Sequence, residues 1–188
     1  MQNWKELYKE LAGKIKPVDE QGNPAVNNQG SELGIPQVKW VDLWNSQIYN
    51  LDNEHPFPTP AIFMAFRGTG TKDMGLKVQE VDLQVDFFIF WETFLDTFKG
   101  AYNQTEALDY LDTIDQVNKL FHGSSGTNYS SMRRVSFSPV DTMGAGNLFN
   151  VTYSCKLIDY SAADEVQEGT FGDLDIEPQT DNKFIVTV

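Results

Sequence analysis

The sequence is short of the residues that build most catalytic and redox sites. It has one cysteine, Cys155, and two histidines, His55 and His122, among 188 residues. A single cysteine excludes an internal disulfide and the thiolate clusters of structural zinc sites. No Ser-His-Asp, Cys-His or His-Glu-x-x-His arrangement has a recognised spacing. We therefore expect a protein that is not an enzyme and has neither cofactor nor metal.

Long hydrophobic runs are also missing. The longest dense apolar stretch, Phe87 to Trp91, is much shorter than the ~20 residues of a membrane-spanning helix. Residues Met1 to Lys16 alternate charged and apolar side chains, unlike a secretion signal. The sequence predicts no membrane partner and synthesis in the cytoplasm.

Basic residues are scarce, with 14 Lys and Arg against 27 Asp and Glu and a net charge of −13. Tight nucleic-acid binding needs cations that displace phosphate counterions, so this balance opposes it. Like charges repel over about a Debye length of ~8 Å, so the surface is still compatible with DNA that passes without adhering.

Apolar periodicity predicts two helices. Residues Asn3 to Ile15 and Asn103 to Phe121 carry apolar side chains three and four positions apart. Asn103 with Glu106 resembles a helix start, and Gly123 is suited to the left-handed conformation that ends a helix. The predicted inner face of the second helix consists of Ala107, Leu108, Leu111, Ile114, Val117, Leu120 and Phe121.

Alternating side chains predict four strands. The strands cover Ala61 to Phe66, Leu76 to Trp91, Met132 to Pro139 and Leu148 to Tyr160. We expect a turn at Gly68-Thr69-Gly70-Thr71, a bulge near Glu80 and a turn at Gly144-Ala145-Gly146. The fold class is thus α+β, with an antiparallel four-stranded sheet packed with two main helices in a single domain, residues 1–160. Residues 18–34, rich in Gly, Asn and Gln, are a loop insertion.

Residues 161–188 form an extended acidic arm that ends in a short strand. Ser161 to Asn182 contains acidic side chains and no Lys or Arg, so it repels itself. The six residues Lys183 to Val188 favour a strand. An isolated strand leaves its backbone unpaired, so we predict that Phe184, Ile185 and Val186 add to a sheet edge of this chain or of a neighbour.

Two further sets of side chains are candidates for binding. The aromatic residues Trp40, Trp44 and Tyr49 are too large to leave in water and pack in the core or on a partner. The carboxylates Asp82 and Asp86 share a strand face, and Asp109, Asp112 and Asp115 lie along a helix. Neither acidic set has the spacing of an EF-hand loop, so a solvated face is the simpler interpretation and divalent metal binding the alternative.

With these segments in order, the chain resembles the phage tail-terminator or tail-completion family, minor tail proteins of long-tailed phages and prophages. The likeness covers about residues 1–160 and is one of layout. It is carried by the following segments: Trp4-Lys5-Glu6-Leu7, Pro58-Thr59-Pro60-Ala61-Ile62-Phe63-Met64, Val81-Asp82-Leu83-Gln84-Val85-Asp86-Phe87, the helix Asn103 to Phe121 and the strand Phe149 to Leu157. The 18–34 insertion and the acidic arm depart from the family pattern.

The resemblance implies a structural virion protein, located in the tail and made in the bacterial cytoplasm. Such proteins self-associate into a ring, usually a hexamer, at the head-proximal end of the tail tube. There they stop tube growth and complete head-tail joining, with tail tube and head-tail connector proteins as partners. On this view some of Asp82, Asp86, Asp109, Asp112 and Asp115 face a lumen through which DNA moves.

Two other classes of function remain open from the sequence. One is a bacterial adaptor or ligand-binding module that uses an aromatic surface around Trp40, Trp44 and Tyr49. The other is an enzyme with an unrecognised carboxylate site, which a metal-dependent change in stability would reveal.

Overall fold

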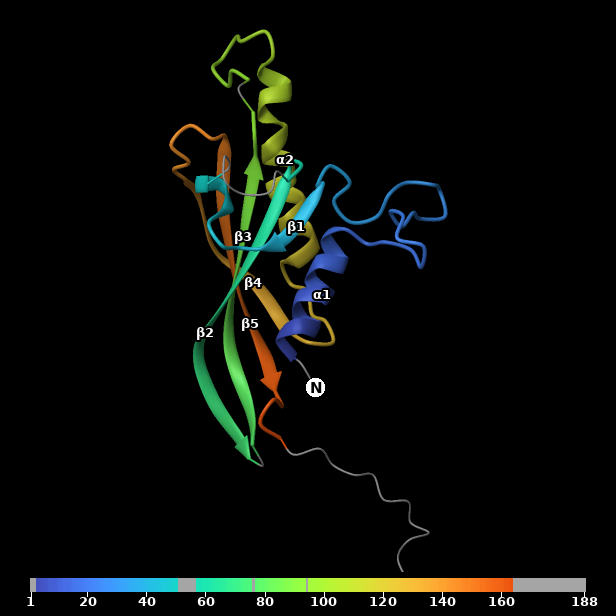
Figure 1. The fold of residues 1–188 in the computed structure, drawn as a ribbon, viewed down its shortest axis with the longest axis vertical. Helices are drawn as coiled ribbons and strands as arrows, with labels where there is room; N and C mark the ends of the chain where they lie inside the picture. The colour runs from blue at the N-terminus through green and yellow to red at the C-terminus, as the bar shows by residue number, and fades with distance from the viewer. Residues whose placement is uncertain (1–2, 51–56, 76, 94, 164–188) are drawn as a thin grey trace, which may run out of the picture.

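The computed structural model describes residues 3–50, 57–75, 77–93 and 95–163, which fold as an α+β unit with one five-stranded mixed sheet. The elements in chain order are α1 (Asn3–Ile15), β1 (Trp40–Leu43), the short 3-10 helix η1 (Gln47–Asn50), β2 (Ala61–Gly75), β3 (Val78–Trp91), α2 (Gln104–Phe121), β4 (Ser130–Val140) and β5 (Asn147–Asp159). The strand order is β1-β2-β3-β5-β4 (Figure 1).

The prediction of four antiparallel strands is wrong, because β1 adds a fifth and parallel strand. Its register runs from Trp40 opposite Ala61 to Leu43 opposite Met64. Four residues without apolar alternation give no strand signal in the sequence. They become a strand only because β2 supplies the hydrogen-bonding edge.

Strands β2 and β3 form one long hairpin whose turn lies later than predicted. Residues 68–71, expected to turn, continue the strand, and β2 reaches Gly75 opposite Val78. Irregularities between Gly68 and Gly70 and between Asp73 and Gly75 absorb extra residues in β2. The expected bulge near Glu80 of β3 is therefore replaced by irregularities in its partner strand, whereas β3 pairs regularly with β5 throughout Gln79–Trp91.

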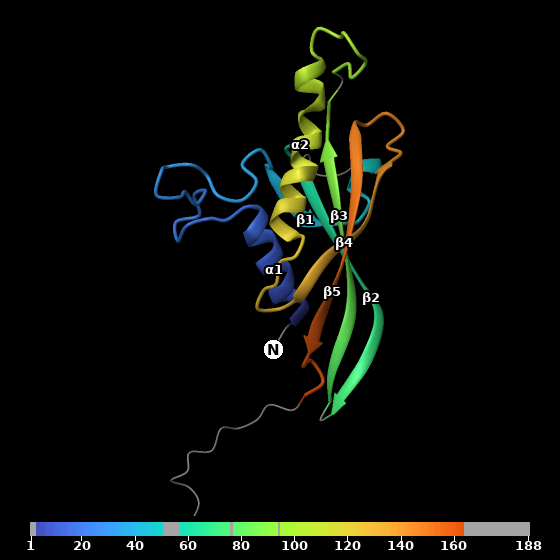
Figure 2. The same ribbon diagram turned by 180° about the vertical axis from the view of Figure 1, so that it is seen from behind.

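Both helices cover one face of the sheet, which we call the helix face (Figures 1 and 2). Leu7, Leu11 and Ile15 of α1 are fully buried there. From α2, Phe121 stacks on Phe87 of β3 with ring centroids 4.6 Å apart. Burial of each such side chain is worth about 1.5–3 kcal/mol. The paired ribbons β3 and β5, covered by α2, confirm the centre of the predicted fold.

Helix α2 begins and ends close to the predicted residues. It starts after Asn103, whose side chain makes no capping hydrogen bond, and Gly123 adopts φ +77° just after its end. The predicted inner face is wrong at Leu111, which is 41% exposed, while Thr113 is buried. Leu111 is on the side of α2 away from Thr113, and Thr113 accepts a hydrogen bond from Gln37 Nε2.

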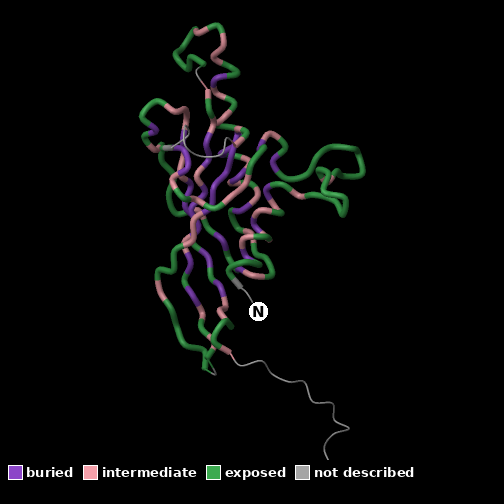
Figure 3. Tube along the Cα trace, viewed as in Figure 1, coloured by how far each residue is buried: buried purple, intermediate pink, exposed green. Residues whose placement is uncertain are grey.

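The opposite face of the sheet, which we call the far face, carries a second and smaller core. It consists of Ile48, Ala61, Phe63, Phe90 and Leu148, with Trp44, Phe57, Phe88, Val140 and Ala145 packed around them. This far-face cluster covers only the part of the sheet where β1 and η1 lie. Figure 3 shows β2 changing from buried to exposed along its length as it leaves that region.

The 18–34 segment projects from the body between α1 and β1 (Figure 1). It contains two isolated bridges, Val18 with Pro24 and Val26 with Glu32, and no helix or longer strand. Asp19 and Asn27 each accept backbone hydrogen bonds within their own turn. The insertion therefore holds its shape through local turns and stays outside the main core.

Candidate functional site

The three predicted aromatic contact residues have different environments. Trp44 stacks on Phe88 with ring centroids 4.1 Å apart and also contacts Phe63, so it belongs to the far-face cluster. Tyr49 meets Trp44 edge-on at 6.3 Å and is 45% exposed. Trp40, in β1, is 40% exposed. Of the three rings, Trp40 and Tyr49 are exposed and Trp44 is partly buried.

The predicted lumen acids lie on opposite sides of the sheet. Asp82 and Asp86 are on the far face, because Leu83, Val85 and Phe87 between and beside them pack against the helices. The remaining three acids are exposed on the outer surface of α2: Asp109, Asp112 and Asp115. The five acids therefore do not share one surface of the described fold.

Within the far-face pair, the two carboxylates differ in burial. Asp82 is exposed and lies 3.6 Å from Lys156 Nζ, which also pairs with Glu80. Asp86 is only 5% exposed. Its carboxylate accepts hydrogen bonds from Thr152 Oγ1 at 2.6 Å and from Gln84 Nε2 at 3.0 and 3.1 Å. Asp86 is therefore a buried, hydrogen-bonded carboxylate, and the alternating pattern of the sequence did not predict its burial.

The outer edge of β2 is the most extensive backbone surface that the sequence did not predict. Strand β1 covers β2 only from Ala61 to Met64, and Trp44 N–H then donates to Met64 O at 2.8 Å. Since the N–H and C=O groups of a strand alternate sides, the amides of Phe66 and Gly68 point the same way as those of Met64. Among the described residues, no strand pairs with that side of β2 from 65 to 75.

This open edge belongs to a hairpin that extends beyond both helices (Figures 1 and 2). Its side chains from Arg67 to Gly75 are nearly all exposed, and they include Met74. Unpaired edges of this kind add a strand from another chain unless they are short or covered. The edge of β2 is therefore the part of the fold best suited to pairing with another polypeptide.

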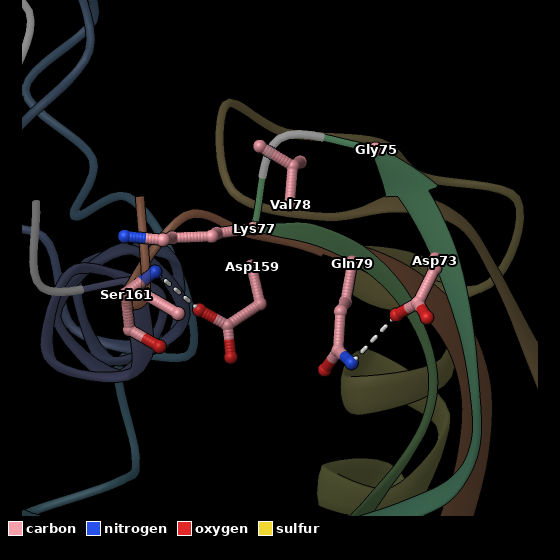
Figure 4. Close-up of a pocket in the computed structure, with 8 residues that line it drawn as sticks. Asp73, Gly75, Lys77, Val78, Gln79, Asp159 and Ser161 are labelled. Carbon is pink, nitrogen blue, oxygen red and sulfur yellow. Dashed lines mark hydrogen bonds between the residues drawn. The ribbon is translucent and has the colours of Figure 1, made fainter. Parts of the chain in front are cut away.

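An open cleft of about 420 Å³ lies at the tip of the hairpin (Figure 4). Two carboxylates line it, and each already has a donor: Gln79 Nε2 is 2.9 Å from Asp73, and Ser161 N–H is 2.8 Å from Asp159. Among the described residues that line the cleft there is neither histidine nor cysteine. The geometry is that of a strand-end turn held by local hydrogen bonds.

His122 and Cys155, the described histidine and the single cysteine, both have structural contacts in the fold. His122 Nδ1 accepts a 3.2 Å hydrogen bond from Arg134 N–H, so the imidazole covers part of the β4 edge. Cys155 is buried on the helix face, and burial raises the pKa of its thiol to about 11. A thiol with this pKa is a weak nucleophile at neutral pH.

Several predictions fall on residues that the structure does not describe. They concern His55, the acidic arm beyond residue 163 and the strand with Phe184, Ile185 and Val186. Within the described ranges, no group of three or more His, Cys, Asp or Glu side chains is placed to hold a metal ion. No helix in those ranges has the length and apolar character needed to cross a membrane.

In comparisons with known proteins, no protein-family model and no curated protein sequence matches the chain.

Proposed function

We propose that this protein is a structural virion protein that self-associates into a ring at the end of a phage tail tube. In that position it stops tube growth and joins the tail to the head connector. The observation that carries the proposal is the open outer edge of β2 beyond Met64. The position at the end of a phage tail is suggested by the resemblance in layout of residues 1–160 to tail-terminator proteins.

A ring requires a heterologous contact, in which one surface of a subunit meets a different surface of the next. The β2 edge suits this role because it offers main-chain hydrogen bonds on a hairpin that projects from the body. Main-chain pairing also fixes the relative orientation of two subunits, which a closed ring needs. The net charge of −13 favours a channel wall that does not hold DNA.

The aromatic adaptor function has less support from the geometry. The stack on Phe88 partly buries Trp44, which leaves Trp40 and Tyr49 as the exposed rings of the three. Hot spots of protein interfaces usually combine several anchors in one packed patch. Two partly exposed rings without such a patch make a weaker interface than the open strand edge.

The test uses two substitutions at one residue of the edge. A Cβ at Gly68 meets only Val81 Cγ1 at 3.6 Å, an ordinary contact, so the position has room for a side chain. Gly68→Pro removes the outward amide, whereas the matched control Gly68→Ala keeps it. We expect wild type and Gly68→Ala to form rings as concentration rises, and Gly68→Pro to stay monomeric.

Sedimentation velocity and negative-stain electron microscopy measure this assembly, and circular dichroism checks the fold of each variant. Rings formed equally well by Gly68→Pro would remove β2 from the interface. The tail-terminator function is tested separately, in a phage that encodes the protein. Particles made without it should show tubes of uncontrolled length and no attached heads, and normal tails would contradict a terminator function.

A further inference from the structure

The later half of β4, at the other side of the sheet from β1, is also an open edge. On its outer side the first half of β4 is covered by the chain that follows α2. Met132 N–H donates to Ser124 O at 2.9 Å, and Arg134 N–H donates to His122 Nδ1 at 3.2 Å. Within the described ranges, the six residues from 135 to 140 have no strand on this side, because β4 is the last strand of the sheet.

Apolar side chains accompany this open segment. Phe137 is 57% exposed and stacks on Phe149 of β5 with ring centroids 6.1 Å apart. Val135, at the bulge between Arg134 and Ser136, is 59% exposed. The bulge and Pro139, which has no amide donor, limit pairing along this edge, so an added strand would use the N–H of Phe137 and the carbonyl oxygens of Phe137 and Pro139. Neither feature covers the exposed side chains of Val135 and Phe137.

Charge indicates which segment fits beside it. Strand β4 contains Arg133 and Arg134 and no acidic residue, in a chain whose net charge is −13. The residues from 164 to 182 contain acidic side chains and no Lys or Arg. After them comes Lys183-Phe184-Ile185-Val186-Thr187-Val188, a strand-forming sequence of six residues. Its length equals that of the open segment.

The residues between β5 and the C-terminal strand are long enough to reach the β4 edge. Asp159, at the end of β5, lies seven residues along that strand from Thr152, which is opposite Ser136. At ~3.3 Å per residue this separation is roughly 23 Å. The 19 residues from 164 to 182 can span at most ~63 Å, which exceeds this separation. A tether that can reach the edge keeps the strand close to it in the same chain, so docking within one chain is favoured over docking between chains at low concentration.

We infer that Lys183–Val188 adds to the open edge of β4 in the same chain, alongside residues 135–140, while the acidic arm lies near Arg133. Docking supplies the hydrogen-bond partners that β4 lacks and covers Val135 and Phe137. It leaves the β2 edge beyond Met64 open to other chains. The inference does not depend on ring formation, because it concerns the single chain.

Hydrogen–deuterium exchange of the backbone amides tests this inference directly. Four proteins are compared: the full chain, a chain that ends at Asn182, the variant Ile185→Pro and the control variant Gln179→Pro. Proline at 185 interrupts the pairing strand, whereas proline at 179 lies in the linker. Pro139 has no amide, and the amides of Ser136, Ser138 and Val140 face β5. We therefore expect the outward amide of Phe137 to exchange at least tenfold faster in the truncated chain and in Ile185→Pro than in the other two proteins.

Two control measurements make the outcome decisive. Amides of β3 should exchange equally in all four proteins, which shows that the fold is intact. Protection of the Phe137 amide should not change on hundredfold dilution, because the partner is tethered. Equal exchange of the Phe137 amide in all four proteins overturns the inference, as does protection that is lost on dilution or that appears on residues 65–75 of β2 instead.

Discussion

Glu10 and Asn128 lie 118 residues apart in the chain and are joined by two hydrogen bonds. Glu10 Oε2 accepts from the backbone N–H and from Nδ2 of Asn128, both at 2.9 Å. Its Oε1 accepts from Thr127 N–H at 2.9 Å. A Cβ on Gly126 would collide with this carboxylate, so glycine at 126 lets the loop close over α1. One acidic side chain thus fastens α1 to the loop that leads into β4.

Glu10→Gln should destabilise the protein at neutral pH, by on the order of 1 kcal/mol, because a charged acceptor is lost. Burial raises the pKa of Glu10, but the hydrogen bonds from Asn128 and Thr127 and the nearby Lys14 outweigh it and hold the pKa below its ordinary value. The carboxylate therefore contributes stability above pH ~4.5 and loses it as pH falls through the lowered pKa. Urea denaturation at pH 7 and at pH 3 measures the difference between variant and wild type.

The control for this prediction is Glu6→Gln on the same helix. Glu6 pairs with Lys9 at 2.9 Å, and both side chains are half exposed. Exposed pairs of this kind contribute about 0–1 kcal/mol. A Glu6 variant that loses as much stability as the Glu10 variant would show that the effect belongs to α1 in general and not to the contact with Asn128.

Thr152→Val should destabilise the protein by about 1.5–3 kcal/mol, because the buried Asp86 carboxylate loses its 2.6 Å donor. Valine keeps nearly the same shape, so the change reports the hydrogen bond and not a cavity. Ser154→Ala, an exposed position on the same strand, should cost less than about 0.5 kcal/mol. Equilibrium urea unfolding compares the two, and equal stability of Thr152→Val and wild type would refute the structural role of Asp86.

Trp44→Ala should cost about 3 kcal/mol, because the stack on Phe88 and the contact with Phe63 are lost from the far-face cluster. Trp40→Ala should cost less than about 1 kcal/mol, since Trp40 is 40% exposed. Thermal unfolding followed by circular dichroism distinguishes them. Similar losses for both tryptophans would contradict the division between a core ring and a surface ring.

Alkaline pH should weaken the fold through two buried groups. Burial raises the pKa of Cys155 to about 11 and that of Tyr153 to about 12. Both groups are held neutral in the fold, so their contribution is complete below the ordinary pKa values of 9 and 10 and falls as pH rises through the raised values. Cys155→Val should lose less stability between pH 9 and 11 than wild type does.

Thiol reactivity gives an independent measure of the Cys155 environment. A thiol-specific reagent at pH 8 should label native Cys155 slowly and the urea-unfolded chain quickly, because only the unfolded thiol is exposed and readily ionised. Rapid labelling of the native protein would show that the helix face opens at this strand.

The sequence by itself determined the elements with strong periodicity. The helix near Asn103 to Phe121 and the ribbons at Val81–Ile89 and Phe149–Leu157 were predictable, because each repeats apolar side chains with the period of its own geometry. Apolar alternation also located the residues that contact the helices. These features depend on residues that are near one another in the sequence, so the sequence pattern alone is enough to predict them.

Only the tertiary structure decided which edges and which polar groups are covered. β1 is a strand because β2 lies beside it, Val135 and Phe137 are exposed because β4 ends the sheet, and Asp86 is buried because Thr152 lies opposite. Burial and pairing depend on residues that are distant in sequence, and a local pattern carries no record of them. The order of strands in the sheet therefore sets the open surfaces on which both proposals rest.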